Sequence, residues 1–345
     1  MKSFVELPKL KAGDQVAIVS PSGDAAGRFP WVYDVGVERL RKQFGLKPKE
    51  YPTTKKIGAT HEEKAKDLMD AFADPQNKAV IATIGGFDQI KMIKPLDAKV
   101  FINNPKPFFG YSDNTHLVNF LWDLGIPSYY GGSLMTQYAF PDKIPSLTTE
   151  FLKHALFDSG EYELKSATEF NDESVSWADR DNWGKPRKFE PNDGWQWDGH
   201  KSTEGVLWGG CLESMVLILA SRHAPSDEDL EGVILYLETS EEIPDLWSVA
   251  YVLMAMGEKG WFNKFQAVLF ARPKTWDFQK PNNSEAKSKY KQGQRDIVLK
   301  TIREYNQSIP VIQNLDFGHT DPQIPVPSGK KARIDSRNKK IFFKY

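Results

Sequence analysis

Residues 107–125 read PFFGYSDNTHLVNFLWDLG, and their order of apolar and polar residues indicates the fold class. A short apolar run stops at a glycine, a tyrosine and a serine. Apolar residues then recur at helical spacing, so the stretch predicts a buried strand, a loop and a helix. The same order occurs in KAVIATIGGFDQIKMIKPLD, residues 78–97, and in residues 14–45. Such repeated units indicate right-handed crossovers, a mostly parallel sheet and a functional site at the carboxyl ends of the strands.

The pattern changes near residue 165. The segment that follows is polar, rich in glycine, proline, asparagine and aspartate, and predicts a connection with short strands. GVLWGGCLESMVLILAS, residues 205–221, then predicts a strand, a glycine turn and a buried helix, and the tail at residues 333–345 predicts a closing hairpin. We therefore expect an N-terminal α/β domain over residues 1–165, a Trp-rich connection over residues 166–203 and a C-terminal domain over residues 204–345.

The composition restricts the class of protein. The chain has 45 Lys and Arg against 46 Asp and Glu, so its net charge of −1 gives no global field that would attract a nucleic acid polymer or an anionic membrane. The single cysteine, Cys211, cannot form an internal disulfide, and no cluster of Cys and His has the spacing of a zinc site. The N-terminus lacks the apolar core of a signal peptide, and runs such as MVLILA are too short to span a bilayer. We expect a cytoplasmic protein with a small-molecule partner and no membrane association.

Ser112 stands between the strand and the helix of the first stretch, and two interpretations of it are open on local grounds. A nucleophile elbow needs a sharp strand-to-helix turn with small residues nearby; Gly110 fits this pattern, whereas Asn114 stands where a second glycine is usual. The alternative is an N-cap, in which the serine oxygen accepts from amides of the first helical turn. As a nucleophile, Ser112 would gain from the helix N-terminus, which stabilises developing negative charge.

Gly85 and Gly86 end the preceding strand. Two glycines let the backbone approach a ligand and direct amides at an oxyanion or a phosphate, although a plain tight turn explains them equally well by themselves. The pair is too short for a dinucleotide or phosphate-binding fingerprint. A neighbouring serine nucleophile would favour the oxyanion hole, because acyl transfer needs backbone donors about 3 Å from the oxyanion.

Glu238 ends the apolar strand VILYLE, residues 233–238. A carboxylate there lies either at a strand mouth, where active sites of open sheets collect, or beside a buried partner. A solvated acidic loop is the alternative, and Glu241 or Glu242 could equally be the important acid.

His319 lies in LDFGHTDPQIPVPSG, a loop rich in proline and glycine. A lone loop histidine is ordinarily a surface residue, but within reach of Ser112 it would be a general base with an unperturbed pKa near neutrality. In that arrangement His319 takes the proton of Ser112, Glu238 fixes the imidazole tautomer, and the amides of Gly86 and Asp113 bind the oxyanion.

Five blocks of the sequence together resemble the LD-carboxypeptidase family of serine peptidases: LKAGDQVAIVSPSG, GYSD, EGVLWGGCLE, YLETSEE and GHTDPQIPVPSG. This family includes muramoyl-tetrapeptide carboxypeptidases and microcin C self-immunity peptidases. The resemblance implies that Ser112 is the nucleophile, Glu238 the triad acid and His319 the base. It assigns the oxyanion donors to the Asp113 amide and to one amide of the glycine pair, for which we choose Gly86.

The resemblance also implies a fold and a function. It predicts a Rossmann-like or flavodoxin-like N-terminal α/β domain with a mostly parallel sheet flanked by helices, a smaller β-rich C-terminal α/β domain, no metal or other cofactor, and a homodimer. LETSEE with a proline two residues further on, GHTDPQ and the Trp-rich connection look more like the microcin-immunity branch. We expect a metal-independent serine carboxypeptidase or amidase that hydrolyses an amide in a small peptide or a peptidyl- or aminoacyl-nucleotide. The alternatives are a murein tetrapeptide carboxypeptidase that removes terminal D-Ala, and a small-ligand binding protein without turnover.

Candidate substrate contacts are less specific. Trp195 and Trp197 alternate, so in a strand they share one face, which could stack on an adenine or simply pin a loop. Gly85 is a further candidate through its backbone. Lys91, Arg187 and Arg272 are candidates for binding the substrate carboxylate by their charge alone.

Overall fold

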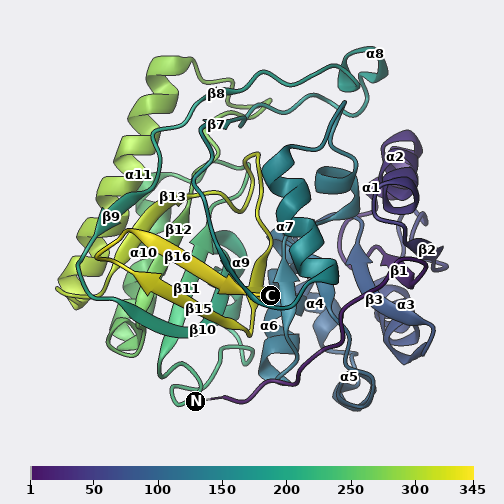
Figure 1. The fold of residues 1–345 in the computed structure, drawn as a ribbon, viewed down its shortest axis with the longest axis horizontal. Coiled ribbons are helices and arrows are strands. Elements are labelled where there is room, and N and C mark those ends of the chain that lie inside the picture. The colour runs from purple at the N-terminus through teal and green to yellow at the C-terminus, as the bar shows by residue number, and fades with distance from the viewer. Residues whose placement is uncertain (1) are drawn as a thin grey trace.

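The computed structural model describes residues 2–345, in which two large sheets lie side by side with helices packed around them (Figure 1). The elements up to the connection are β1 (Gln15–Val19), α1 (Ala25–Arg28), α2 (Pro30–Lys42), β2 (Lys47–Glu50), α3 (His61–Ala73), β3 (Asn77–Ala82), α4 (Ile90–Ile93), α5 (Ala98–Asn103), β4 (Phe108–Gly110), η1 (Ser112–Asn114), α6 (Thr115–Asp123), β5 (Ser128–Tyr130), η2 (Leu134–Tyr138), α7 (Ser146–Phe157) and β6 (Glu161–Glu163).

The remaining elements are β7 (Glu169–Phe170), α8 (Arg180–Trp183), β8 (Glu190–Pro191), β9 (Gln196–Asp198), β10 (Thr203–Cys211), α9 (Leu212–Leu219), β11 (Val233–Glu238), α10 (Leu246–Glu258), η3 (Trp261–Asn263), β12 (Ala267–Ala271), α11 (Ser284–Tyr305), β13 (Val311–Leu315), β14 (Val326–Ser328), β15 (Lys331–Asp335) and β16 (Lys340–Lys344). Among residues 2–345, no helix combines the length and the hydrophobicity needed to cross a bilayer.

Sheet A, the N-terminal sheet, has the strand order β14-β5-β4-β3-β1-β2, and all its pairs are parallel except β14 with β5. The central strands β1, β3 and β4 are buried almost throughout, as expected for parallel strands covered on both faces. Strand β2, which reads KPKE, is exposed at one edge, where its lysines disfavour pairing with another chain. The carboxyl ends of β3, β4 and β5 therefore meet at one sheet edge, and the α/β class expected from the sequence is confirmed.

Sheet B, the C-terminal sheet, has the order β6-β16-β15-β10-β11-β12-β13-β9. Strands β10 to β13 are parallel, and the antiparallel hairpin β15-β16 confirms the hairpin expected at the C-terminus. Helix α10 packs against α9 and α11. Each half of the chain also contributes an edge strand to the sheet of the other half: β14, from the C-terminal half, belongs to sheet A, and β6, from the N-terminal half, belongs to sheet B. The domain limits given above stay a prediction.

The glycine turn expected after β10 is absent, because β10 continues through both glycines to Cys211. An added Cβ at Gly209 would lie 1.7 Å from the carbonyl oxygen of Tyr236, so glycine lets β10 approach β11 here. Gly210 has a φ of 151°, and an added Cβ there would lie 2.3 Å from a methyl carbon of Thr115. The two glycines therefore allow close packing of β10 against β11 and against α6.

Candidate active site

Ser112 occupies a sharp turn at the carboxyl end of β4. Its φ is 64°, in the left-handed region that a residue with a side chain seldom adopts, at a cost of about 1–3 kcal/mol that surrounding contacts must offset. The serine does not cap the helix: the 3₁₀ turn begins at Ser112 itself, and its N-cap residue is Tyr111. The Ser112 amide donates to the hydroxyl of Tyr130 at 3.0 Å. A strained serine between strand and helix is the geometry of a nucleophile elbow.

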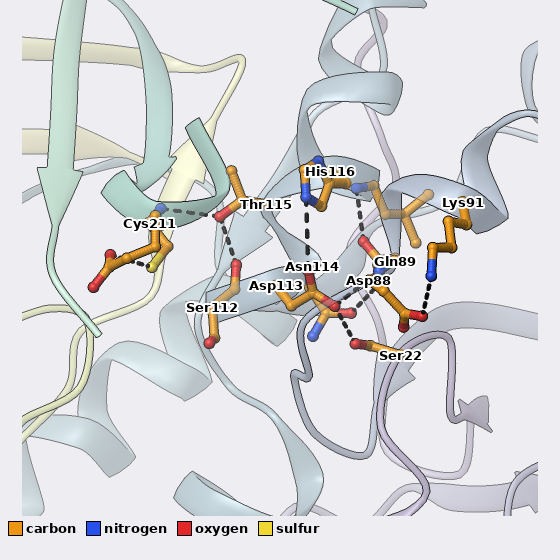
Figure 2. A network of polar contacts seen from close by, with 12 residues as sticks. Ser22, Asp88, Gln89, Lys91, Ser112, Asp113, Asn114, Thr115, His116 and Cys211 are labelled. Atoms are coloured by element: carbon orange, nitrogen blue, oxygen red, sulfur yellow. Dashed lines mark hydrogen bonds and ion pairs between the residues drawn. The ribbon is translucent and has the colours of Figure 1, made fainter. Parts of the chain in front are cut away.

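The Asp113 carboxylate anchors this turn from within the N-terminal core (Figure 2). It accepts hydrogen bonds from the Ser22 hydroxyl and from the Gln89 amide, the latter at 3.0 Å. Burial raises the pKa of Asp113, and these donors offset only part of the effect. The Nε2 atom of His116 lies 3.6 Å from Asp113 Oδ1, and burial lowers the pKa of His116 to about 4, so this imidazole is neutral near pH 7.

Gly85 and Gly86 lie directly against the serine turn. An added Cβ at Gly85 would lie 2.8 Å from Ser112 Cβ and 3.3 Å from the Asp113 amide nitrogen. An added Cβ at Gly86 would lie 2.9 Å from the amide nitrogen of Gly23. Within residues 2–345 no backbone hydrogen bond outside the regular elements uses the Gly86 amide. Only glycine fits at either position, and the Gly86 amide is available for a ligand.

His319 and Glu238 form a buried pair. Glu238 is fully buried at the end of β11, and its Oε2 atom lies 2.6 Å from His319 Nδ1. An added Cβ at Gly318, whose φ is 85°, would lie 2.6 Å from the same oxygen, so glycine is required beside the histidine. Burial lowers the pKa of His319, but Glu238 and Glu241 outweigh it and raise that pKa well above its ordinary value. On sequence grounds Glu238 and Glu241 were alternative candidates for the important acid, but in the structure both carboxylates contact the imidazole of His319.

Tyr130 connects the serine turn to the buried acid, and the sequence analysis missed it. Its hydroxyl accepts from the Ser112 amide and donates to Glu238 Oε1 at 2.5 Å. Burial raises the Tyr130 pKa well above its ordinary value, so the phenol keeps its proton for this bond. The available signal was its place at the end of β5, the next parallel strand after β4, because residues there face the same sheet edge.

Polar contacts between α6 and β10 fix the serine turn against the C-terminal sheet (Figure 2). The Thr115 hydroxyl donates to the Ser112 carbonyl at 2.6 Å and accepts from the Cys211 amide at 2.9 Å. The Asn119 side chain donates to the Gly209 carbonyl at 3.1 Å. The two halves of the chain therefore hold Ser112 and Glu238 in a defined relation.

A cavity of about 580 Å³ opens over these residues, and both Ser112 and His319 line it. Its walls also include Gly85, Gly86 and Glu241, whereas Glu238 lies behind the imidazole and is not part of the lining. The aromatic residues of the lining are Phe29, Phe87, Tyr111, Phe140, Trp177, Trp183 and Phe278. The connection therefore contributes aromatic side chains to the cavity.

Trp195 and Trp197, the candidates for stacking, lie outside this lining. The indole nitrogen of Trp195 donates to Asp316 at 3.0 Å, and Trp197 belongs to β9, where it pairs with Ile312 of β13. Both side chains are partly buried against the hydrophobic core cluster that includes Ile312 and Leu315 of β13. They therefore do not share the cavity with Ser112.

The three cationic candidates have different surroundings. Arg187 lines the cavity, and so does Lys274, which the sequence analysis missed. Arg272 is buried in an ion pair with Asp316 at 2.8 Å, and Lys91 pairs with Asp88 at the surface. Arg187 and Lys274 are thus the Lys and Arg side chains of the cavity lining, and Lys274 Nζ also donates to the Asp172 carbonyl and to Ser174 Oγ at 2.5 and 2.9 Å.

The fold and this cavity define the class of protein. A serine turn at the carboxyl edge of a parallel sheet, with an imidazole and a carboxylate beside it, is typical of serine hydrolases. Two family models match the chain, the LD-carboxypeptidase N-terminal domain over residues 16–131 and the LD-carboxypeptidase C-terminal domain over residues 204–334. The chain belongs to the LD-carboxypeptidase family, peptidase S66, and is a serine peptidase. The family expected from the sequence is confirmed.

The chain is similar over nearly its whole length to proteins of two kinds. It is 27% identical to the microcin C7 self-immunity protein MccF of Escherichia coli, over 96% of this chain and 93% of that protein. It is 26% identical to a probable murein peptide carboxypeptidase of Bacillus subtilis, over 96% of this chain and 91% of that protein. A solved MccF-like protein from Streptococcus pneumoniae, in complex with AMP, is 28% identical with a TM-score of 0.82, covering 96% of this chain and 99% of that one.

Proposed function

We propose that the chain is a metal-independent serine carboxypeptidase or amidase whose triad is Ser112, Glu238 and His319. The observation that carries the proposal is the contact of 2.6 Å between Glu238 and His319 Nδ1, beside a cavity that His319 shares with Ser112. A carboxylate on Nδ1 fixes the tautomer and leaves Nε2 to act on the serine proton. The family assignment favours this enzyme over the alternative of a binding protein without turnover.

The proposed mechanism follows from these positions. Ser112 Oγ attacks the substrate carbonyl while its proton passes to His319 Nε2, and the amides of Gly86 and Asp113 bind the oxyanion. Glu238 stabilises the imidazolium, which then protonates the leaving amine. Water, deprotonated by the same imidazole, releases the acyl group and regenerates the serine.

The proposed substrate is a small peptide or a peptidyl- or aminoacyl-nucleotide. The aromatic walls of the cavity suit a nucleobase, because stacking contributes about 1–3 kcal/mol per base. The S. pneumoniae relative that binds AMP supports the same substrate class. Trp177 and Trp183, which line the cavity, take the stacking role that we first considered for Trp195 and Trp197, with Gly85 as a backbone contact.

Removal of D-Ala from a murein tetrapeptide is the alternative reaction, and the B. subtilis relative supports it. Arg187 and Lys274 would serve either substrate, since both substrates carry an anionic group.

The test offers purified protein a murein tetrapeptide ending in D-Ala and, in parallel, an aspartyl-adenylate mimic, each with and without EDTA. We expect the adenylate mimic to be cut faster, Ser112→Ala to lose hydrolysis, and chelation to have no effect. Ser176→Ala, which changes another serine of the cavity wall, is the matched control and should keep activity. Full hydrolysis by folded Ser112→Ala would refute the assignment of the nucleophile.

We also propose a cytoplasmic homodimer, following the family resemblance. Val216, Leu217, Trp247 and Tyr251 are exposed apolar residues on α9 and α10, and an apolar surface of this kind suits contact with a second chain. Light scattering should give twice the mass of one chain, and a single-chain mass would contradict the dimer.

A further inference from the structure

His319 contacts two carboxylates, one on each ring nitrogen. Glu238 Oε2 lies 2.6 Å from Nδ1, and Glu241 Oε2 lies 3.0 Å from Nε2. The two acids differ in exposure, because the Glu238 side chain is fully buried whereas 53% of the Glu241 side chain is exposed. Glu241 also lines the cavity, and Glu238 does not. The outer carboxylate therefore lies on the substrate side of the imidazole.

This outer contact conflicts with the role of His319 as a base. To accept the Ser112 proton, Nε2 must carry a free lone pair. A nitrogen that donates to a carboxylate carries a proton and has none to offer. With the Glu241 carboxylate 3.0 Å from Nε2, the protonated imidazolium is favoured, and in that form His319 cannot begin acylation.

The backbone of the loop that carries Glu241 is held by hydrogen bonds of Ser240, whereas the Glu241 side chain is exposed and forms one ion pair. Ser240 is bonded through its amide and its hydroxyl to half-buried Glu213, at 3.0 and 2.7 Å, so the backbone stays in place. Among residues 2–345, His319 is the only ion-pair partner of Glu241. Rotation of the Glu241 side chain into the cavity therefore breaks a single contact.

We propose that Glu241 is a positioning residue that acts as a resting latch, holding His319 Nε2 in the free protein and releasing it when the imidazolium loses its proton to solvent. The proposal rests on the triad assignment above. The neutral imidazole no longer attracts the carboxylate, and its Nε2 lone pair becomes available to the hydroxyl of Ser112. The latch thus sets the pH at which acylation begins.

The other charged and titratable groups around the imidazole come from four segments. Glu238 ends β11, Tyr111 follows β4 and contacts the imidazole ring edge-on, Lys274 follows β12, and Asp321 belongs to the histidine loop. Burial raises the pKa of Glu241, but the charge of His319 outweighs it and lowers that pKa to about 2, so Glu241 is ionised whenever the imidazole titrates. Removing its charge must lower the pKa of His319, and the acid limb of acylation must move to lower pH.

The test measures the second-order rate at which an uncharged fluorophosphonate labels Ser112, as a function of pH. In Glu241→Gln the midpoint of the acid limb should fall by about one pH unit or more, the effect of removing an opposite charge within a few ångströms. Glu241→Ala should show the same shift. Glu242→Gln is the matched control, since Glu242 is an exposed neighbour outside the cavity, and its profile should coincide with that of the unmodified protein.

The possible results separate the latch from the triad. If Glu241→Gln is labelled and the midpoint of its acid limb is unchanged, the latch is overturned and the triad is not. This holds whether the labelling rate equals that of the unmodified protein or is lower at every pH. No labelling of the unmodified protein at any pH overturns the triad assignment and the latch with it. Titration of the His319 ring by NMR gives the same midpoints without a reaction and should show the same fall in Glu241→Gln.

Discussion

Tyr130→Phe removes one hydroxyl that serves both the nucleophile and the buried acid. In the unmodified protein this hydroxyl accepts from the Ser112 amide at 3.0 Å and donates to Glu238 Oε1 at 2.5 Å. The ring itself stays in place, because Phe has the same shape. The substitution therefore leaves a buried carboxylate oxygen and the amide of a strained serine without these partners.

The magnitude follows from those two lost bonds. A hydrogen bond to a charged group contributes about 1.5–3 kcal/mol, and a buried polar atom left unpaired costs about 1–3 kcal/mol. We expect the free energy of unfolding of Tyr130→Phe to fall by about 2 kcal/mol. Acylation should slow by about tenfold or more, because the serine turn loses the contact that fixes its amide and small misplacements of reacting groups are costly. Glu238 without this donor attracts the imidazolium more strongly, so the acid limb should move to higher pH, opposite to the shift for Glu241→Gln.

The assay is fluorophosphonate labelling of Ser112 against pH, with urea denaturation followed by circular dichroism. Tyr129→Phe is the matched control, since it removes another buried hydroxyl of β5, bonded to Lys9 at 2.8 Å, away from the serine. This control should lose stability but label at the unmodified rate. An unchanged rate and midpoint for Tyr130→Phe would refute the role given to its hydroxyl.

Three further predictions concern the glycine beside Glu238 and the buried ion pair between Lys287 and Asp172. Gly318→Ala should lose labelling by at least tenfold, because its Cβ would lie 2.6 Å from the Glu238 carboxylate at a positive φ; normal labelling would contradict this steric argument. Lys287→Met should lower the free energy of unfolding by about 3–5 kcal/mol, since buried Asp172 then loses its partner at 2.8 Å, whereas exposed Lys289→Met should change little. Burial raises the pKa of Asp172 but its donors Lys287 and Thr275 outweigh it, so the pKa is lowered. The contribution of Asp172 to the free energy of unfolding is therefore fully present above its unfolded pKa of about 3.9 and is lost as the pH falls through its lower folded pKa. The midpoint of urea denaturation should decrease over this pH range, and a constant midpoint would contradict the role of Asp172.

Local patterns were sufficient for much of the fold. The strand, turn and helix around Ser112 were predicted because β4 and α6 carry their own apolar periodicity. Helix α11 was missed, since its 22 residues are mostly polar and bury only a narrow stripe that includes Val298 and Ile302. The glycine turn predicted in β10 was wrong because close approach of β11, a tertiary contact, explains both glycines.

The residues of the candidate site were likewise predicted only in part from the sequence. Ser112, Glu238 and His319 could be named because each follows a strand or lies in a distinctive loop, and their triad remains a proposal. Tyr130 could not be identified, and Glu241 could be named only as an alternative acid, since the importance of both lies in contacts with residues far away in the chain. The tryptophan pair was chosen by strand alternation, but the indoles of the cavity come from a turn, at Trp177, and from the short helix α8, at Trp183.

The most direct test of the account is to locate the covalent adduct by mass spectrometry after labelling with a fluorophosphonate. We predict one adduct per chain, on the peptide that contains Ser112, with none in Ser112→Ala and at least a hundredfold slower labelling in His319→Gln. An adduct on another serine, or equal labelling of the Ser112→Ala protein, would contradict the account.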